Sequence, residues 1–396
     1  MKPRVLILTA GYGEGHNAAA RALAAACDTA HGPGTAVLVD VFQVAAPRLS
    51  QISRRAYIDL INALPRAWSF VYGWVDRSAY LPKLFSLLRR ERRIIEELIA
   101  RERPTVICST YPVYAFLLQE ISRHRAIGIP HFNIVTDSIS INSLWWRAGA
   151  AGWFVPNEDS AEVMQRAGVA ADRLHICGFP VAPFFSDHAG KFHPTDLATG
   201  AAPRVLYIIN SGTRGVIETT RRLFAETGWE ITCAVGRDEK LYRQLTALAA
   251  GRTRATEILG WTDQIPRLLM THHVVVSKAG GATTQEAIAA RCPMIVNQIV
   301  PGQEEGNYEL LRRHGAGALA ETPDAVIAEL RRAFADGGRG WHAWRDALAS
   351  LTRPDAARDI AAQVIARSAA SEGHEPVPVP LRTVAAGPEV AEGATA

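Results

Sequence analysis

Two glycine-containing stretches hold the residue types that could bind an anionic ligand. The first, Gly11-Tyr-Gly-Glu-Gly-His-Asn17, lies between an aliphatic run and an alanine-rich stretch. Glycines let the backbone approach a ligand closely, and the N-terminus of a following helix favours anionic or polar groups. His16 is the informative residue, because a histidine directly after such a turn would face the crevice at the carboxyl edge of a sheet. The alternative is a histidine at a helix start that is exposed to water.

The second stretch, Ser277-Lys-Ala-Gly-Gly-Ala-Thr-Thr-Gln-Glu286, directly follows an apolar run. Gly280 and Gly281 would open a helix whose free N–H groups can hold a diphosphate. Glu286 would lie roughly one to two turns inside that helix. Its carboxylate could accept hydrogen bonds from a ribose diol there.

A polar loop, Pro301-Gly-Gln-Glu-Glu-Gly-Asn307, follows the next apolar run and is rich in side chains suited to sugar hydroxyls. By itself a charged loop of this kind is usually a solvated turn. The loop and the preceding glycine stretch each follow a predicted strand and lie close together in the sequence. This combination is more specific than either stretch alone.

The elements that position these stretches can be predicted from alternating patterns. A chain of 396 residues suits two domains of about 150 to 200 residues each. Aliphatic runs and helical stretches alternate over residues 1–185 and again over residues 204–367, which predicts two doubly wound domains. Residues 186–203 have the composition of a linker, and residues 368–396 that of a disordered tail. The predicted fold class is α/β, with two Rossmann-like domains facing across a cleft.

The composition excludes several classes of protein. Hydrophobic residues make up 48% and charged residues 21% of the chain, which are values of a globular protein. A net charge of +4 is too small by itself to indicate nucleic acid. The five scattered cysteines contain no C-x-x-C pair, so we expect neither a disulfide framework nor a zinc site, and a cytoplasmic location. We expect no secretory signal, and no apolar run approaches the roughly 18 residues that span a bilayer.

Positive charge is concentrated in residues 48–93. This segment contains ten basic and three acidic residues, with seven aromatic residues among them. Basic residues next to Trp and Tyr are typical of an interfacial membrane anchor, with about 1 kcal/mol for each basic residue near anionic lipid. The candidate membrane contacts are Trp68, Trp74, Arg89, Arg90, Arg92 and Arg93. The alternative is that the aromatic residues pack in a core and the arginines form its solvated face; a nucleic-acid surface would need a recognised fold beside it.

Several motifs resemble one family in combination. They are the run from Leu8 to Ala20 around Gly-Tyr-Gly-Glu-Gly-His, Val135-Thr-Asp-Ser138, Leu144-Trp-Trp146, Cys177-Gly-Phe-Pro-Val181 and the two polar stretches above. Over residues 3–335 the chain resembles the monogalactosyldiacylglycerol synthase and processive diacylglycerol glycosyltransferase family. The resemblance implies a GT-B fold, a UDP-sugar donor bound by the C-terminal domain, an inverting mechanism and no obligatory metal or cofactor. The sequence also contains no Asp-x-Asp, the pair with which metal-dependent transferases hold a cation on the diphosphate.

The resemblance also implies roles for individual residues of the donor site. Gly281 and Thr283 would contact the diphosphate and Glu286 the ribose, while Gln303 and Glu304 would contact the donor sugar.

On the acceptor side, the resemblance makes His16 the candidate base, or the residue that orients the acceptor hydroxyl. Asp137 is the second candidate base, and Gly13 and Gly15 are candidate residues of the acceptor loop. The chain departs from the family at Asn210-Ser-Gly-Thr-Arg-Gly215, where relatives usually have a glycine-rich turn. Arg214 could neutralise phosphate or a sugar carboxylate, or point to water, so the identity of the donor sugar stays open.

The function predicted from the sequence is inverting transfer of a hexosyl group from a UDP-sugar to a membrane lipid. Diacylglycerol is the expected acceptor, at the inner face of the cell membrane. Three alternatives are open: transfer to a polyprenyl-diphosphate sugar, sugar-nucleotide epimerisation and binding without catalysis. An epimerase would share the two-domain fold but would have no use for a basic and aromatic acceptor surface. Glucose, galactose and glucuronic acid are all possible donor sugars.

Overall fold

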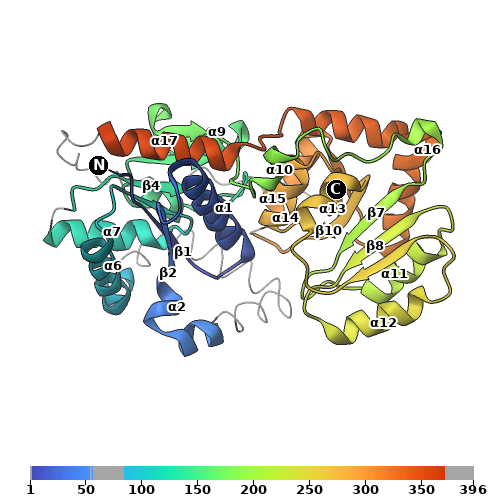
Figure 1. The fold of residues 1–396 in the computed structure, drawn as a ribbon, viewed down its shortest axis with the longest axis horizontal. Coiled ribbons are helices and arrows are strands. Elements are labelled where there is room, and N and C mark those ends of the chain that lie inside the picture. The colour runs from blue at the N-terminus through green and yellow to red at the C-terminus, as the bar shows by residue number, and fades with distance from the viewer. Residues whose placement is uncertain (1, 54–55, 57–83, 126, 303, 371–396) are drawn as a thin grey trace, which may run out of the picture.

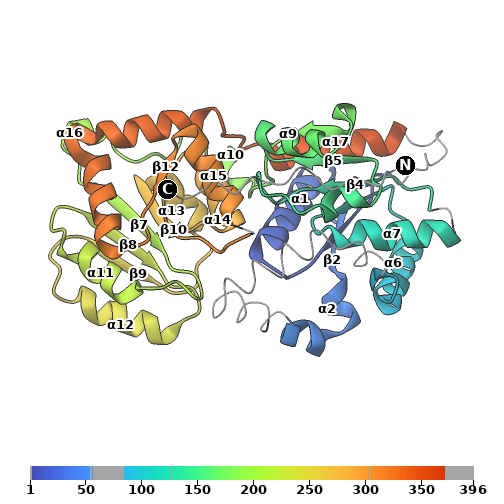
Figure 2. The ribbon, with the colours of Figure 1, turned by 180° about the vertical axis from the view of Figure 1, so that it is seen from behind.

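The computed structural model describes residues 2–53, 56, 84–125, 127–302 and 304–370. Two parallel six-stranded sheets lie side by side, each flanked by helices (Figure 1, Figure 2). We refer to the parts built on these sheets as the first and the second domain. The predicted α/β class, with two doubly wound sheets, is confirmed.

The first sheet has the strand order β2-β1-β3-β4-β5-β6, and all neighbouring strands are parallel. Strand β1 is buried along its whole length, because helices cover both faces of the sheet. The strands are β1 (Val5–Thr9), β2 (Ala36–Asp40), β3 (Val106–Ser109), β4 (His131–Ile134), β5 (Gly152–Val155) and β6 (Leu174–Ile176). The helices are α1 (Glu14–His31), α2 (Val41–Ala45), α6 (Arg89–Glu102), α7 (Val113–His124), α8 (Leu144–Arg147), α9 (Glu158–Arg166) and α10 (Phe184–Asp187), with a 3-10 turn at Ala171–Arg173.

The second sheet has the order β12-β11-β10-β7-β8-β9, again with parallel neighbours. Its strands are β7 (Arg204–Ile208), β8 (Glu230–Ala234), β9 (Thr256–Leu259), β10 (Val274–Lys278), β11 (Met294–Gln298) and β12 (Gly317–Leu319). The helices that follow the linker are α11 (Val216–Ala225), α12 (Glu239–Ala249), α13 (Ile265–Thr271), α14 (Gly281–Ala289), α15 (Glu305–His314), α16 (Pro323–Ala349) and α17 (Ala356–Ala370), and a 3-10 turn spans Leu197–Thr199.

Three short strands, β6, β9 and β12, are not predicted by the sequence. Each lies at the edge of its sheet. An edge strand pairs on one side only, and most residues of these three strands are partly or fully exposed. The long aliphatic run that marks a central strand is therefore missing from them.

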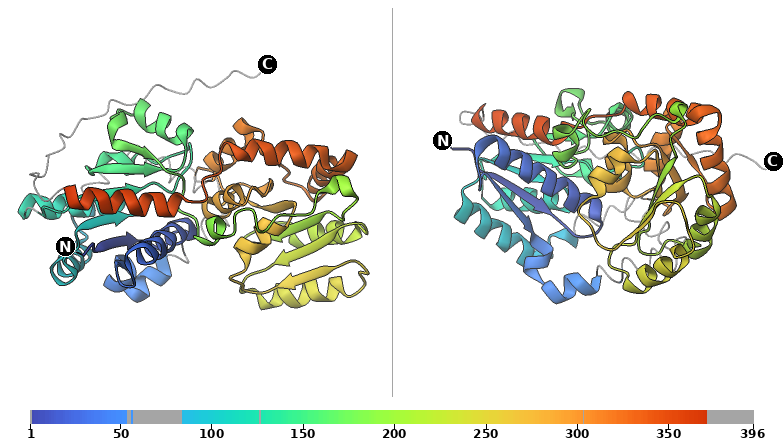
Figure 3. Two further views of the ribbon diagram at one scale, coloured as in Figure 1. Left: turned by 45° about the horizontal axis from the view of Figure 1, so that its top comes forward. Right: turned by 45° about the vertical axis from the view of Figure 1, so that its right-hand side comes forward.

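The last helix returns to the first domain. Ala357, Ile360 and Val364 of α17 are buried in a cluster with residues of β1 and α1, and α17 lies beside α1 (Figure 3). The sequence prediction placed residues 204–367 in the second domain, whereas the structure packs 356–367 against the first sheet. The spacing of these apolar residues marks one buried helix face, but spacing alone does not say which sheet covers it.

The predicted linker is partly anchored. Leu197 is buried in the core of the second domain, together with Tyr207 and Trp341. Gly338 has a φ of 84°, and a Cβ there would lie 2.8 Å from Leu197 Cδ1, so a side chain at this position would displace the linker. The predicted tail at 371–396 lies outside the described residues. Within the described part of the chain, no helix combines the length and the apolar character needed to cross a membrane.

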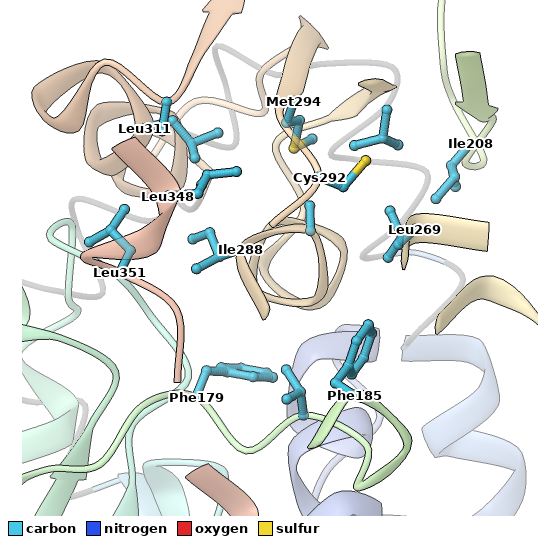
Figure 4. Close-up of a cluster of buried hydrophobic side chains, with 14 of the residues drawn as sticks. Phe179, Phe185, Ile208, Leu269, Ile288, Cys292, Met294, Leu311, Leu348 and Leu351 are labelled. Atoms are coloured by element: carbon cyan, nitrogen blue, oxygen red, sulfur yellow. The ribbon is translucent and has the colours of Figure 1, made fainter. Parts of the chain in front are cut away.

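Both domains contribute to one apolar cluster around α14. Ile288 of α14 packs there with Phe179 and Phe185, from the chain that connects the domains, and with Ala19 of α1. Figure 4 shows Phe179, Ile288 and Leu351 on one side of this helix. The helix α14 is therefore held by residues of both domains.

Candidate active site

Each sheet has a point where the strand order reverses, and this is where doubly wound proteins bind ligands. In the first sheet it lies between β1 and β3, and in the second between β7 and β10. The two carboxyl edges meet: a Cβ on Gly15 would lie 3.7 Å from the backbone nitrogen of Ala282, and one on Gly281 would lie 3.7 Å from the carbonyl oxygen of Thr136. The glycine stretches singled out in the sequence therefore face each other across the interface between the domains.

The glycine turn of the first domain is fixed by one carboxylate. Asp40 accepts hydrogen bonds from the backbone of Gly11 (3.0 Å) and, at its other oxygen, of Gln43 (2.9 Å), where it caps α2. Gly13 precedes α1 with a φ of 128°, a conformation that residues with a side chain rarely adopt. Gly13 thus shapes the turn, and Gly15 permits the close approach to Ala282.

His16 is buried, so the alternative of a water-exposed histidine is wrong. Its Nδ1 lies 2.8 Å from Thr136 Oγ1, and its ring packs edge-on against Tyr111, with 5.1 Å between the ring centroids. Burial lowers the pKa of His16 to about 4, although a hydrogen bond to the backbone of Thr110 opposes this shift. The imidazole is therefore neutral at physiological pH.

Asp137 follows the residue that contacts His16. Burial raises the pKa of Asp137 to about 6, while hydrogen bonds from Trp145 and the backbone of Asn142 oppose the rise. The Trp145 indole Nε1 donates to Oδ2 of Asp137 over 2.7 Å. Asp137 consequently titrates closer to neutrality than an ordinary aspartate, and only one of its oxygens is used by Trp145.

Trp145 connects the two candidate bases and has no role in the sequence prediction. Its ring centroid is 6.3 Å from that of His16, and the side chain is completely buried. The Trp145 carbonyl accepts hydrogen bonds from Trp153 Nε1 (2.6 Å) and Asn133 Nδ2 (3.3 Å). The sequence marks this position only as one half of the Trp-Trp pair in a family motif.

The start of α14 offers backbone donors. Gly280 precedes the helix in an extended conformation, no side chain caps the helix, and its first turn carries no acidic residue. The N–H groups of Gly281, Ala282 and Thr283 are the first of the helix and have no carbonyl partner within it. Such a helix start can hold an anion such as a diphosphate.

Glu286 lies on the next turn of α14 and faces the first domain. Burial is the main cause that raises the pKa of Glu286 to about 7; the carboxylate of Glu14 raises it further, and Arg21 opposes it. Glu14 and Arg21 belong to α1 and form an exposed ion pair. Glu286 is thus at the interface between the domains, close to the helix start that would hold the diphosphate.

Glu304 is buried and both of its oxygens contact the protein. Oε2 accepts a hydrogen bond from the backbone of Val300 (3.0 Å), and Oε1 lies 3.2 Å from Nζ of Lys278. Its predicted contact with the donor sugar stays a prediction, and Gln303 lies outside the described residues. Lys278 stands within the quoted motif, but the sequence prediction gives it no role.

The turn that contains Arg214 is held by hydrogen bonds to one amide side chain. Gln298 at the end of β11 accepts a hydrogen bond from the Arg214 backbone (3.0 Å) and donates one to the carbonyl of Gly212 (3.2 Å). Asn210 donates from Nδ2 to Ser277 Oγ over 3.0 Å, which ties the loop after β7 to the end of β10. The Arg214 side chain itself is exposed.

An exposed aromatic residue lies at the same sheet edge. Trp261, just after β9, is 67% exposed, and the guanidinium of Arg237, just after β8, lies 5.8 Å from its ring centroid. A flat ring at the carboxyl edge is a surface on which a nucleobase could stack. The sequence prediction gives neither residue a role, because the strand before Trp261, β9, is itself not predicted by the sequence.

The four predicted membrane arginines lie at the start of α6. Arg92 pairs with Glu120 (3.7 Å) and Arg93 with Glu97 (2.9 Å), while Arg89 and Arg90 are exposed. The opposite face of α6 buries apolar side chains. Trp68 and Trp74 lie outside the described residues, so their predicted membrane contact stays a prediction.

The described residues contain no group of three or more His, Cys, Asp or Glu side chains that could hold a metal ion. The absence of an obligatory metal or cofactor stays a prediction.

Comparison with solved structures defines the fold as that of GT-B glycosyltransferases. The glycosyltransferase SnogD from Streptomyces nogalater shares 17% identity with a TM-score of 0.54, covering 93% of this chain and 100% of SnogD. MnaA of S. aureus, solved with UDP, shares 12% identity with a TM-score of 0.60, covering 94% and 99% of the two chains.

Sequence comparison then shows which glycosyltransferases this chain resembles. Residues 16–181 match the family model described as monogalactosyldiacylglycerol (MGDG) synthase. A processive diacylglycerol beta-glucosyltransferase of Bacillus cytotoxicus is 26% identical over 383 residues, which is 96% of this chain and 97% of that protein. A protein of the same name from Bacillus cereus (strain B4264) is 25% identical over 386 residues, with the same shares covered. The family resemblance seen in the sequence motifs is confirmed.

Replacing Glu286 tests the donor side of this site. Above pH 7, where the Glu286 carboxyl is mostly ionised, Glu286→Ala should weaken binding of UDP by about 1–3 kcal/mol, because a hydrogen bond from the ribose to a charged acceptor is lost. Isothermal titration calorimetry measures the change, and Glu321→Ala, at an exposed position of the same domain, is the control. Equal UDP affinity in Glu286→Ala and wild type would show that Glu286 only supports the interface.

Proposed function

We propose that this protein transfers a hexosyl group from a UDP-sugar to diacylglycerol or a related membrane lipid, with inversion at the anomeric carbon. This proposal rests mainly on one contact between the domains. At the start of α14, Gly281 lies against the carbonyl of Thr136, directly before Asp137. An anion site and a titratable carboxylate are thus adjacent across the interface. The names of the relatives, which are diacylglycerol glucosyltransferases, support the same acceptor.

In the proposed reaction, a base takes the proton of the acceptor hydroxyl as its oxygen attacks the anomeric carbon. The bond from that carbon to the diphosphate oxygen breaks, and UDP leaves with the electron pair. The N–H groups at the start of α14 would stabilise the charge that develops on the diphosphate. Arg214, on the turn after β7, is an exposed cation that could assist them.

The two candidate bases differ in strength. A general base works best when its pKa lies near the operating pH. The pKa of Asp137, raised to about 6, lies closer to neutrality than that of His16, lowered to about 4. We therefore infer that Asp137 takes the proton and that His16, bonded to Thr136, orients the loop in front of it.

The reaction itself is tested by incubating the protein with UDP-glucose, UDP-galactose, UDP-glucuronic acid and UDP-N-acetylglucosamine beside diacylglycerol vesicles. With at least one donor, mass spectrometry should find a glycosylated diacylglycerol, and one UDP should be released for each sugar transferred. A donor that is isomerised without release of UDP would indicate an epimerase. Transfer to a polyprenyl-diphosphate sugar but not to diacylglycerol would show that the proposed acceptor is wrong. UDP binding without any product would indicate a protein that binds the nucleotide without catalysis.

The base is tested by the pH dependence of kcat/KM. If Asp137 is the base, it must be ionised, so activity should fall as the pH drops through about 6. Asp137→Asn should lower turnover by about 100- to 10,000-fold without weakening UDP binding, because a negatively charged carboxylate does not attract the diphosphate and its loss removes no donor to it. The pKa of Glu286 lies near 7, so this carboxyl could also change activity in the same pH range. A Glu286→Gln variant removes that titration and shows which part of the pH dependence belongs to Glu286. A fall in activity only near pH 4, with loss of turnover in His16→Ala instead, would assign the base to His16.

We also propose that the protein acts from the cytoplasm, bound peripherally to the anionic inner face of the cell membrane. The exposed arginines at the start of α6 support this, together with exposed apolar side chains on the segments near it: Val44, Leu49, Ile52, Leu84 and Leu87. Basic side chains are attracted to anionic lipid, and apolar side chains beside them can enter the interface.

Replacing Arg89, Arg90, Arg92 and Arg93 by Gln should shift the protein from the pellet to the supernatant when anionic vesicles are sedimented. The attraction is about 1 kcal/mol for each basic residue, and high salt should weaken it in the wild type. The matched control replaces four exposed helical arginines of the second domain, Arg221, Arg222, Arg331 and Arg332, by Gln. Equal sedimentation of both variants and wild type would show that these α6 arginines are an ordinary solvated surface.

A further inference from the structure

A lysine and a glutamate form a largely buried ion pair inside the candidate donor site. Lys278 is the last residue of β10, and Glu304 directly precedes α15. Their side chains are 22% and 9% exposed, and Lys278 Nζ lies 3.2 Å from Glu304 Oε1. Removing two charges from water opposes such a pair, so it contributes little to stability unless other contacts compensate. The position of the pair suggests that it serves the binding of a ligand and not the stability of the fold.

The pair lies beside the residue that opens α14. A Cβ on Gly280 would lie 3.8 Å from Glu304 Oε1 and 3.9 Å from Lys278 Cε. Gly280 directly precedes the first N–H groups of α14, which carry the positive end of the helix dipole. The ammonium of Lys278 therefore lies beside the place where a diphosphate would bind, with its charge balanced by Glu304 while no ligand is there.

The two side chains of the pair differ in how freely they can move. Glu304 Oε2 accepts a hydrogen bond from the backbone N–H of Val300, and the Glu304 N–H donates to the Val300 carbonyl (3.1 Å), so the carboxylate is held by its own turn. Lys278 carries its charge on a flexible four-carbon chain that can be redirected over a few ångströms. A ligand anion at α14 would thus attract the lysine without displacing the glutamate.

We propose that Lys278 is a catalytic residue: its ammonium moves from Glu304 to the diphosphate of the bound UDP-sugar and stabilises UDP as it departs. This inference rests on the proposed function. When the bond from the anomeric carbon breaks, its electron pair passes to the β-phosphate oxygen, and Lys278 faces that growing negative charge. Glu304, released at Oε1, then accepts hydrogen bonds from hydroxyl groups of the donor sugar.

The test compares UDP with uridine, which lacks the diphosphate. Lys278→Met keeps most of the apolar stem and removes the charge. It should weaken UDP binding by about 10- to 100-fold, the loss expected for one charged hydrogen bond, and leave uridine binding unchanged. Lys278→Arg should restore UDP binding to within a few-fold of wild type. Lys240→Met, at an exposed lysine on α12, is the matched control.

Turnover separates a catalytic from a supporting role. At saturating UDP-sugar, Lys278→Met should lower kcat in addition to raising KM, because the charge on the leaving group is greatest in the transition state. Glu304→Gln should not weaken UDP binding, since it removes the negative charge that competes with the diphosphate for Lys278. It should lower kcat, because the Glu304 carboxylate can no longer accept hydrogen bonds from the donor sugar. Thermal melting follows the fold of each variant, and Lys278→Gln provides a second neutral replacement.

Three results would overturn the inference. They are equal UDP affinity in wild type, Lys278→Met and Lys278→Gln; equal loss of UDP and uridine binding; or a Glu304→Gln variant that loses UDP as strongly as Lys278→Met. The last result would mark the pair as a structural support of the loop. A wild-type protein that binds no UDP at all would instead contradict the proposed function itself.

Discussion

The site depends on the way in which both domains hold α14. Ile288 on the inner face of this helix packs with Phe179 and Phe185 of the connecting chain and with Ala19 of α1. Gln285 on the same helix donates from Nε2 to Ser138 Oγ of the first domain over 2.9 Å. The apolar cluster fixes the helix axis and the polar contact fixes its rotation. The start of α14 is therefore directed at the loop that carries Asp137.

Close approach between the domains requires small residues at the contact. Gly306 of α15 shows this most clearly, because a Cβ there would lie 1.8 Å from the carbonyl oxygen of Ser138. Arg313 and His314, at the end of the same helix, bind Asp159 of α9 at 3.1 and 3.0 Å. The helices α14 and α15 together bring the donor side to the loop after β4. In the proposed reaction, the base and the leaving group would then act in one step on a donor held between them.

Much of this arrangement could be predicted from the sequence, and the remainder could not for identifiable reasons. Aliphatic runs followed by glycine turns predicted the two sheets, and with them the positions of His16 and Gly281 at the carboxyl edges. The pattern could not show that His16 is buried, that α17 returns to the first domain, or that Trp145 binds Asp137. These depend on contacts between segments that are distant in the sequence or on the course of a loop. Periodicity describes one element at a time and contains no such information.

The central claim is a single displacement across the contact between α14 and the Asp137 loop. The anomeric configuration of the product tests it most directly, and proton NMR of the glycolipid formed from an α-linked UDP-sugar measures it. One displacement, with the acceptor on the side of Asp137 and the diphosphate at α14, predicts a β-glycoside. An α-glycoside would mean that the configuration is retained, which attack from the side opposite to the leaving diphosphate cannot produce, and would contradict the mechanism.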